Sequence, residues 1–307
     1  MDWLHSCKEI LREADGQTLP PKFKLPVLPT AITEFAKRSN DPEVSAGDLA
    51  RILESDSGLT ADILQLVNSS TNGLRCTVSS VKQAISLLGF KKVQSFVLTV
   101  GAKRAMSRCD SRLINLSHFW STNLERALFA REIAGLLRVD PEIAFAGAML
   151  QDFLLPALTS ALLNGYGVFV DERSSHPRML IDFEQQRFGW HHAKAAAHVA
   201  WLWNFPGEIV CGIYHHHQGA AILLDPEFGQ TTVAAVALSS LLPDALNQTP
   251  DGLDSLLTLQ EHWPQFDLQL IAERIAAGFY EMGGNQNYHI TLHKRLTKRH
   301  TRAKAVC

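Results

Sequence analysis

The sequence of 307 residues predicts an all-α protein. Three observations support this prediction. From residue 30 onward, apolar residues recur at the three- and four-residue spacings that place them on one face of a helix. Residues that favour helix ends separate these stretches at short intervals. No stretch of the first third alternates apolar and polar residues over more than a few positions, so we expect no sheet there.

The N-terminal part is expected to contain a short helix at 3–13 and an extended segment after it. We assign residues 1–18 to this N-terminal helix and arm. The segment 19–29 contains four prolines, which exclude regular helix because the ring fixes φ and removes the backbone donor. The first helix of the main body should then start at Thr30 and end at the Asp-Pro pair 41–42.

Capping signals divide the following residues into short helices. Ser45 with Asp48 three residues later is typical of a capping box, and Ser80 with Gln83 repeats the pattern. Between these two starts, a run of Asn, Ser, Thr and Gly at 68–73 predicts a turn, whose first asparagine should bond the backbone. A bundle of short helices is the simplest arrangement that fits.

A strong helix start follows at 140–142, where an aspartate precedes a proline and a glutamate. The helix that begins there carries Gln151 and Asp152 in the apolar run 148–157, and Pro156 should kink or end it. This run is apolar enough to be buried. Asp152 therefore needs either a hydrogen-bonded partner or a metal ion to make its burial tolerable.

The rest of the chain continues in helical pattern. The exception is the glycine-rich segment 164–177, which we expect to be a mobile surface loop. Further helices are expected at 180–188, 191–203, 206–217, 231–242 and 267–282.

Charge, cysteine content and apolar runs limit the classes of protein that fit. The formal net charge is −2, but residues 285–307 carry six Lys or Arg and no acid, which leaves about −8 on residues 1–284. An acidic body is not typical of a nucleic-acid-binding surface, so we do not expect nucleic acid as a partner. Five dispersed cysteines indicate neither a disulfide framework nor a zinc site. We expect a cytoplasmic protein without a membrane span, because no apolar run approaches about 18 residues.

Four stretches resemble one known family. They are Leu-Pro-Val-Leu-Pro at 25–29, the Asn-Ser ending of 59–69, Gln-Ala-Ile-Ser-Leu-Leu-Gly within 78–90, and 192–217, which runs from a histidine through Trp-Asn-Phe-Pro to paired histidines. In this order they are similar to the HDOD domain, a regulatory relative of the HD phosphohydrolases that occurs in bacterial signalling proteins. The resemblance implies two packed helical bundles and a role in signal transduction.

The resemblance also implies a division of the chain. The HDOD domain would cover residues 19–218, with an N-terminal helical bundle at about 19–115 and a degenerate HD-like part at about 116–218. Residues 219–284 would add helices that complete the HD-like part. Residues 285–307 would form a basic tail, either disordered or a short helix formed on a partner.

An HD phosphohydrolase binds one or two divalent metals through a helix His, an adjacent His-Asp pair and a later Asp, so that a metal-bound water attacks phosphorus. On the resemblance, the first His falls near Thr122 and the His of the pair falls at Gln151, so only Asp152 matches. The later Asp falls within 237–240, where no carboxylate occurs. Because too few ligands remain, we expect no catalytic residue, no bound metal and no cofactor.

The histidines leave one alternative open. In the family fold, the helix that carries His192 and the helix that ends at His216 and His217 approach Asp152. These side chains would suit zinc, iron or manganese, although consecutive helical residues point about 100° apart and cannot all face one ion. Otherwise the histidines cap helix carbonyls and pack beside tryptophans, and Asp152 accepts hydrogen bonds from Thr122, a nearby histidine or backbone amides.

We therefore expect a non-catalytic bacterial signalling module that acts through contacts with partner proteins and carries a degenerate metal site. The alternative is a sensor that binds a nucleotide, such as a cyclic dinucleotide, or a metal in the vestigial cleft. A metal-dependent phosphohydrolase is a weaker alternative, because it would need ligands that the sequence lacks. The expected vestigial positions are Thr122, Gln151, Asp152, His192, His216 and His217.

Overall fold

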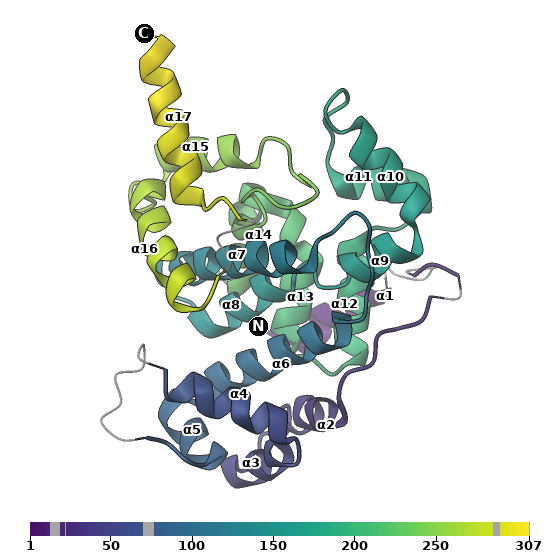
Figure 1. Ribbon diagram of the computed structural model, residues 1–307, viewed down its shortest axis with the longest axis vertical. Coiled ribbons are helices and arrows are strands. Elements are labelled where there is room, and N and C mark those ends of the chain that lie inside the picture. Colours follow the sequence, from purple (N-terminus) through teal and green to yellow (C-terminus); the bar gives the residue numbers. More distant parts are fainter. Residues whose placement is uncertain (13–18, 22, 70–76, 285–288, 307) are drawn as a thin grey trace.

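The computed structural model describes residues 1–12, 19–21, 23–69, 77–284 and 289–306. These residues form helices and contain no β-strand, which confirms the predicted all-α class. A small lobe of short helices lies below a larger helical body in Figure 1, and the long helix α6 (Phe90–Met106) runs between them. This arrangement confirms the two packed bundles, since α6 contacts helices of both.

The lobe combines α6 with four short helices, two of which start at the caps that the sequence predicts. The capping box of Ser45 and Asp48 is complete, and Ser80 caps the helix before α6. Asn68 bonds backbone groups on both sides of the predicted turn at 68–73, most of which lies outside the described residues. The four helices are α2 (Thr30–Arg38), α3 (Ala46–Glu54), α4 (Ser57–Val67) and α5 (Val81–Leu88).

The helix α8 (Pro141–Leu150) lies at the centre of the body. Asp140 caps its first turn through backbone amides, as the start signal predicts. A Cβ on Gly147 would lie 2.7 Å from Val236, so glycine permits the close approach of a neighbouring helix. Because neighbours cover every face, each residue from Ile143 to Leu150 is buried. The neighbours are α6, α7 (Leu116–Leu137), α13 (Gly207–His215) and α14 (Thr232–Ser239).

The chain turns sharply after α8 at residues 151–154 and continues as α9 (Leu155–Ala161), with Pro156 in the first helical turn. The 21 residues Pro141–Ala161 are long and apolar enough to cross a membrane by length and composition, so the expectation that no such run exists is wrong. Within the folded protein, 94% of the apolar window is buried, as in the core of a globular domain.

The prediction of a mobile loop at 164–177 is wrong for residues 164–172, which form most of a helix. Tyr166 is buried there and packs against Phe188 with ring centroids 5.5 Å apart. A Cβ on Gly165 would lie 2.8 Å from the same phenylalanine ring, so the glycine serves close packing of two helices and not a turn. The two helices are α10 (Leu163–Glu172) and α11 (Leu180–Phe188).

The remaining helices close the ends of the body. The N-terminal helix packs on α13, where the thiols of Cys7 and Cys211 lie 3.7 Å apart. At the other end, Leu292 and Leu296 of the basic segment are buried in a core shared with α7. Residues 285–288 lie outside the described part of the chain. These helices are α1 (Trp3–Arg12), α12 (His192–Leu202), the 3-10 helix η2 (His216–Leu224), α15 (Gly252–His262), α16 (Leu268–Glu281) and α17 (Leu292–Val306).

Candidate functional site

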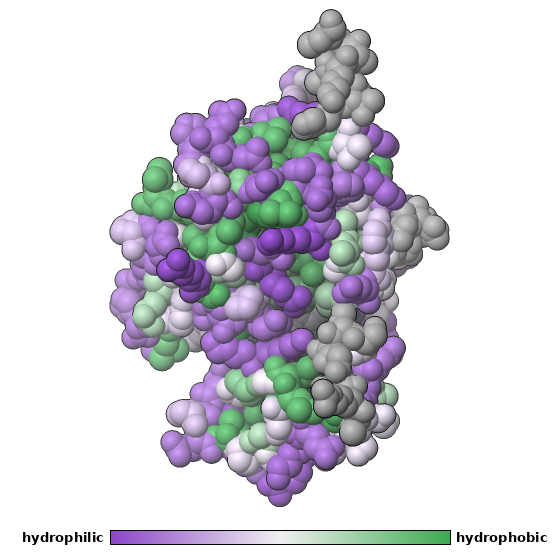
Figure 2. All heavy atoms as spheres, turned by 90° about the vertical axis from the view of Figure 1, so that its left-hand side faces the viewer, coloured by the Kyte–Doolittle hydropathy of each residue, from purple (hydrophilic) through white to green (hydrophobic). Residues whose placement is uncertain are grey.

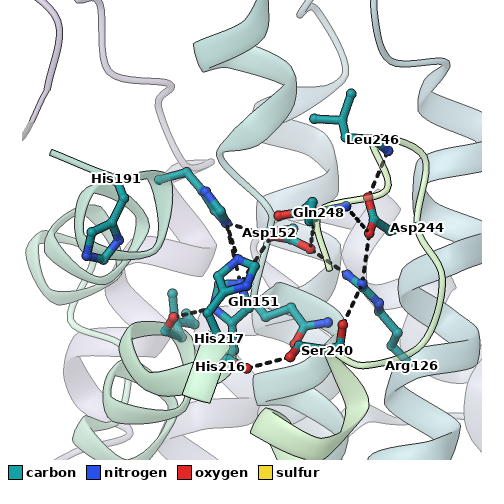
Figure 3. A network of polar contacts seen from close by, with 12 residues as sticks. Arg126, Gln151, Asp152, His191, His216, His217, Ser240, Asp244, Leu246 and Gln248 are labelled. Atoms are coloured by element: carbon teal, nitrogen blue, oxygen red, sulfur yellow. Dashed lines mark hydrogen bonds and ion pairs between the residues drawn. The ribbon is translucent and has the colours of Figure 1, made fainter. Parts of the chain in front are cut away.

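Asp152 lies in the turn between α8 and α9, where its side chain is 1% exposed. Its Oδ2 accepts hydrogen bonds from Arg126 Nη1 at 2.7 Å and from Gln248 Nε2 at 2.9 Å. Its Oδ1 accepts no well-aligned hydrogen bond from a described residue. The two oxygens of this carboxylate therefore have different surroundings, which Figure 3 shows from close by.

Arg126, on α7, is as deeply buried as Asp152. Its guanidinium also donates to the carbonyl oxygens of Ser240 and Leu242, at 3.1 and 2.8 Å, and contacts Asp244 Oδ2 at 3.3 Å. A buried cation is tolerable when it is paired and its protons are hydrogen-bonded. Arg126 lies on the side of Asp152 that faces away from the histidines (Figure 3), where both of its terminal nitrogens are hydrogen-bonded and only its Nε has no partner among the described residues.

Three imidazoles face the other oxygen of Asp152. The Nε2 atoms of His192 and His216 lie 3.2 and 3.3 Å from Asp152 Oδ1. The Nε2 of His217 lies 3.0 Å from that of His192. One ligand atom from each of these four residues lies within 4.8 Å of the others, so they could hold a single metal ion.

A second layer of hydrogen bonds orients two of these rings. His192 Nδ1 lies 2.6 Å from Glu184 Oε2, and Tyr166 donates to the other oxygen of Glu184 at 2.6 Å. His216 Nδ1 lies 2.7 Å from the carbonyl oxygen of Ile213. Since a carbonyl can only accept, the Nδ1 of His216 carries a proton, and its Nε2 is the ring nitrogen that faces the site. Metal-ligating histidines have this arrangement.

Burial and the carboxylates set the protonation of the site when no cation is bound. Burial lowers the pKa of His192, but the charges and hydrogen bonds of Glu184 and Asp152 raise it to about 10. His192 is then an imidazolium between two carboxylates. Burial would raise the pKa of Asp152, but the close imidazoles of His192 and His216 and the positive charge of Arg126 hold it well below its usual range. Burial holds the pKa of His217 well below its ordinary value.

Two of the six predicted positions do not join this cluster. Gln151 is buried next to α14, where its Oε1 accepts from Ser239 Oγ at 3.4 Å. The Oγ1 of Thr122 lies 3.5 Å from Nδ1 of His289, and Thr122 is not among the described hydrogen-bond partners of Asp152. The expected bond between Thr122 and Asp152 is therefore not formed.

The neighbouring histidines turn away from the cluster. His191 caps α12 by accepting from a backbone amide, and burial lowers its pKa to about 3. The ring of His215 packs on Phe228 with centroids 4.5 Å apart. The chain passes from α helix to 3-10 helix at His216, and His216 and His217 both reach the site. Of the three consecutive histidines, only His216 and His217 therefore face the site, in agreement with the expectation that consecutive helical residues cannot all face one ion.

Sequence reasoning missed the residues that support the cluster, namely Arg126, Glu184, Tyr166, Asp244 and Gln248. Only Arg126 carries a local signal, because it directly precedes an apolar run in a helix that should be buried. The others carry none. Gln248, for example, is 96 residues from Asp152 in sequence.

The cavity next to the cluster is small. It has a volume of about 10 Å³ and is lined by Thr122, Asp152, Asp244 and Gln248 among others. A cavity needs about 10–15 Å³ of accessible space to hold one water molecule. This cavity at Asp152 therefore has room for no more than a water molecule or an ion.

Comparison with known proteins agrees with this geometry. The family model of the HDOD domain matches residues 25–219. An uncharacterized protein of Treponema pallidum (strain Nichols) is 25% identical over 273 residues, which are 83% of this chain and 50% of that protein. The chain thus spans about half the length of that curated relative.

Solved structures show the same fold at low identity. An HDOD domain protein of unknown function from Geobacter sulfurreducens is 21% identical with a TM-score of 0.60, over 91% of this chain and 96% of that one. A candidate phosphohydrolase from Shewanella amazonensis SB2B is 20% identical with a TM-score of 0.62, over 92% and 96%. A candidate signal transduction protein from Marinobacter aquaeolei VT8 is 23% identical with a TM-score of 0.60, over 92% and 65%. Since the family model matches more than half of the sequence, the chain belongs to the HDOD domain family.

Proposed function

We propose that this chain is a non-catalytic signalling module of the bacterial cytoplasm that acts through contacts with partner proteins. The observation that carries the proposal is the buried ion pair of Arg126 and Asp152. In an HD phosphohydrolase the matching aspartate binds metal, whereas here one of its oxygens is bonded to an arginine. Family membership and the name of the Marinobacter protein support a role in signal transduction.

Two further features oppose hydrolysis. A hydrolytic metal needs an open position for water and room for the substrate, and small-molecule pockets measure about 300 Å³ or more. The cavity at Asp152 measures about 10 Å³. In addition, Gln151 stands where the family pattern has an imidazole, and its amide lies next to Ser239 and not in the cluster. This cavity is also too small to hold a nucleotide, so it does not support the alternative of a nucleotide sensor.

A turnover assay tests the proposal. The untagged protein would be incubated with Mn²⁺, Fe²⁺ or Zn²⁺ and with nucleotides, cyclic dinucleotides and a generic phosphodiester. We expect no turnover above that of metal in buffer. Turnover that is lost in Asp152→Asn would overturn the proposal. Turnover of equal size in Asp152→Asn would come from a contaminant, because it would not depend on the site.

A second candidate function, the binding of one divalent metal ion, is favoured by the charges around the cluster. Asp152, Glu184 and Asp244 provide three buried or nearly buried negative charges, and Arg126 provides one positive charge. Protonation of His192 leaves one negative charge in excess. A divalent ion beside neutral histidines would balance the set, and burial of an unbalanced charge is costly.

The atoms that face the centre of the cluster fit such an ion. Asp152 Oδ1 has no well-aligned donor, and the Nε2 atoms of His192 and His217 face each other at 3.0 Å. Asp152, His192, His216 and His217 would hold the ion, which would link α12, η2 and the turn after α8. Its role would be to join these elements, because the closed site leaves no room for a substrate.

Measurement of the metal content distinguishes a cluster that holds a metal ion from one in which His192 is protonated. Untagged protein would be analysed for bound metal and titrated with Zn²⁺, Fe²⁺ and Mn²⁺ by calorimetry. We expect one ion per chain, and about 10–100-fold weaker binding in Glu184→Gln, which loses the carboxylate that orients His192. His198→Ala is the matched control, since His198 lies on the same helix as His192 but is partly exposed and is not one of the cluster residues. Absence of bound metal together with no heat on titration would remove this candidate.

A further inference from the structure

A second pocket lies between the two bundles, away from the buried cluster. It has a volume of about 520 Å³ and opens between α6 of the lobe and α7 and α8 of the body. On the face shown in Figure 2, the outline of the molecule steps inward where the lower lobe meets the body. The volume lies in the range of about 300–1,000 Å³ that small-molecule sites occupy.

The wall of this pocket is mainly apolar and aromatic. Each of the three helices contributes to it, so the surface is built from both bundles. The apolar part of a ligand bound there would be removed from water and would contact side chains whose positions are fixed by the helix packing. The apolar wall consists of Phe96 and Val100 of α6, Trp120 and Leu124 of α7, and Phe145 and Met149 of α8.

Two hydroxyl groups in the wall lack partners. Ser95 and Thr99 lie one turn apart on α6 and are 2% and 9% exposed. Neither side-chain oxygen has a hydrogen-bond partner among the described residues. Buried polar groups are ordinarily hydrogen-bonded, so two unpaired hydroxyls in one pocket indicate a site that a polar ligand or ordered water completes.

The pocket also carries excess positive charge. Lys92, Lys103 and Arg131 line it with only one acid, Glu142. Arg131 contacts that acid at 3.4 Å, whereas Lys103 lies 5.6 Å from the ring centroid of Trp120 and has no carboxylate partner among the described residues. Lys103 is exposed at the rim of the pocket, where the neighbouring protein atoms lower its pKa by desolvation, and a nearby anion would oppose this effect.

We infer that this pocket binds a small organic anion. The apolar or aromatic part of the anion lies against Trp120 and Phe145, and its negative group faces Lys103. The apolar surface, the two hydroxyls without described partners and the lysine without a described carboxylate select such a ligand together. This site is separate from Asp152 and does not depend on the function proposed above. Because α6 belongs to the lobe and α7 and α8 to the body, the bound anion connects the two bundles.

Two fluorescent probes test the inference. Anilinonaphthalene sulfonate carries rings and a negative charge, and phenylnaphthylamine carries the same rings without the charge. We expect the sulfonate to bind at one site per chain, and Lys103→Met to weaken it by about tenfold while leaving the neutral probe unchanged. Lys82→Met is the matched control, because Lys82 is an exposed lysine of α5 that does not line the pocket.

A second variant addresses the position of the ring system. Thr99→Leu adds bulk to the pocket without a charge change, so it should weaken both probes by a similar factor. Thermal unfolding of each variant excludes dye binding to partly unfolded protein. Equal affinity of the native protein for the charged and neutral probes, or unchanged sulfonate binding in Lys103→Met and Thr99→Leu, would overturn the inference.

Discussion

At the scale of single residues, Arg126 makes the burial of Asp152 possible. It bonds one oxygen of that carboxylate, two backbone carbonyls and a second aspartate within one fully buried set of contacts. Removing one partner of a buried ion pair leaves an uncompensated charge, and that loss exceeds the net contribution of the pair itself. The consequence is a stability that depends strongly on a residue far from the protein surface.

We predict that Arg126→Met lowers the free energy of unfolding by about 3–5 kcal/mol. The methionine fills similar space but removes the cation paired with Asp152 and the donor of two carbonyls, and leaves Gln248 as the donor to Asp152 Oδ2. Urea unfolding followed by far-UV circular dichroism measures the change. Arg274→Met is the matched control: its ion pair with Glu132 is exposed, so a loss of about 0–1 kcal/mol is expected.

A double variant checks the cause. Combining Arg126→Met with Asp152→Asn removes both charges, so the double variant should lose less stability than the sum of the two single variants. Strict additivity, or an Arg126→Met variant as stable as Arg274→Met, would contradict the assignment of Arg126 as the partner of Asp152.

The sequence predicts that Asp152 needs a partner for its buried carboxylate, but it does not predict which residue provides that partner. An aspartate within an apolar run requires a partner, and that inference rests on local composition alone. The partner comes from another helix, and the orientation of His192 depends on Glu184 and Tyr166. Such contacts follow from how helices pack, which the spacing of apolar residues along one chain segment does not specify.

At the scale of helices, start signals are predicted well because capping is local. Ser45, Ser80, Asp140 and Asp267 each cap the helix that follows them. The wrong prediction of a loop at 164–177 arises from tertiary packing, which is not local. Its glycines suggest a loop, yet Gly165 admits the ring of Phe188, and that contact is tertiary. Local chemistry therefore places helix starts, and tertiary packing decides ambiguous segments.

The cap of α8 gives a pH-dependent prediction. Asp140 bonds the first amides of α8 and pairs with Lys91 at 2.7 Å. Burial would raise the pKa of Asp140, but Lys91 and the backbone amides lower it overall. Since the folded pKa lies below the unfolded value of about 3.9, the stabilisation is fully present above that value and is lost as the pH falls through the folded pKa.

We predict that Asp140→Asn lowers the free energy of unfolding by about 0.5–1 kcal/mol at pH 7, since asparagine keeps the cap but loses the charge. The difference from the native protein should shrink below about pH 4. Urea unfolding of both proteins between pH 3 and pH 7 measures it. Lys91→Met should show a similar loss at pH 7, and a difference that stays constant down to pH 3 would contradict the role of this charge.

At the scale of the whole molecule, the C-terminal segment closes the body. Leu292 and Leu296 share a buried core with α7 and α16. His289 Nε2 lies 2.7 Å from Glu125 Oε2, and the amide of Leu292 donates to Glu125 Oε1 at 2.6 Å. The charge pattern predicts a basic tail, but its first residues belong to the fold. A pairing between residues 164 positions apart leaves no trace in local composition.

Removal of this C-terminal segment should destabilise the body. A chain that ends at Gly284 loses both leucines, whose burial contributes about 3–6 kcal/mol together, and leaves the buried Glu125 without its partners. We expect a large fall in unfolding temperature, or loss of soluble protein, whereas a chain that ends at Arg299 keeps these contacts and should stay close to the native value. If the shorter chain does not fold, Leu296→Ala in the full chain should still cost about 2–5 kcal/mol by urea unfolding. A chain ending at Gly284 with native stability would mean that residues 289–296 contribute nothing to the core and that the whole segment is an independent tail.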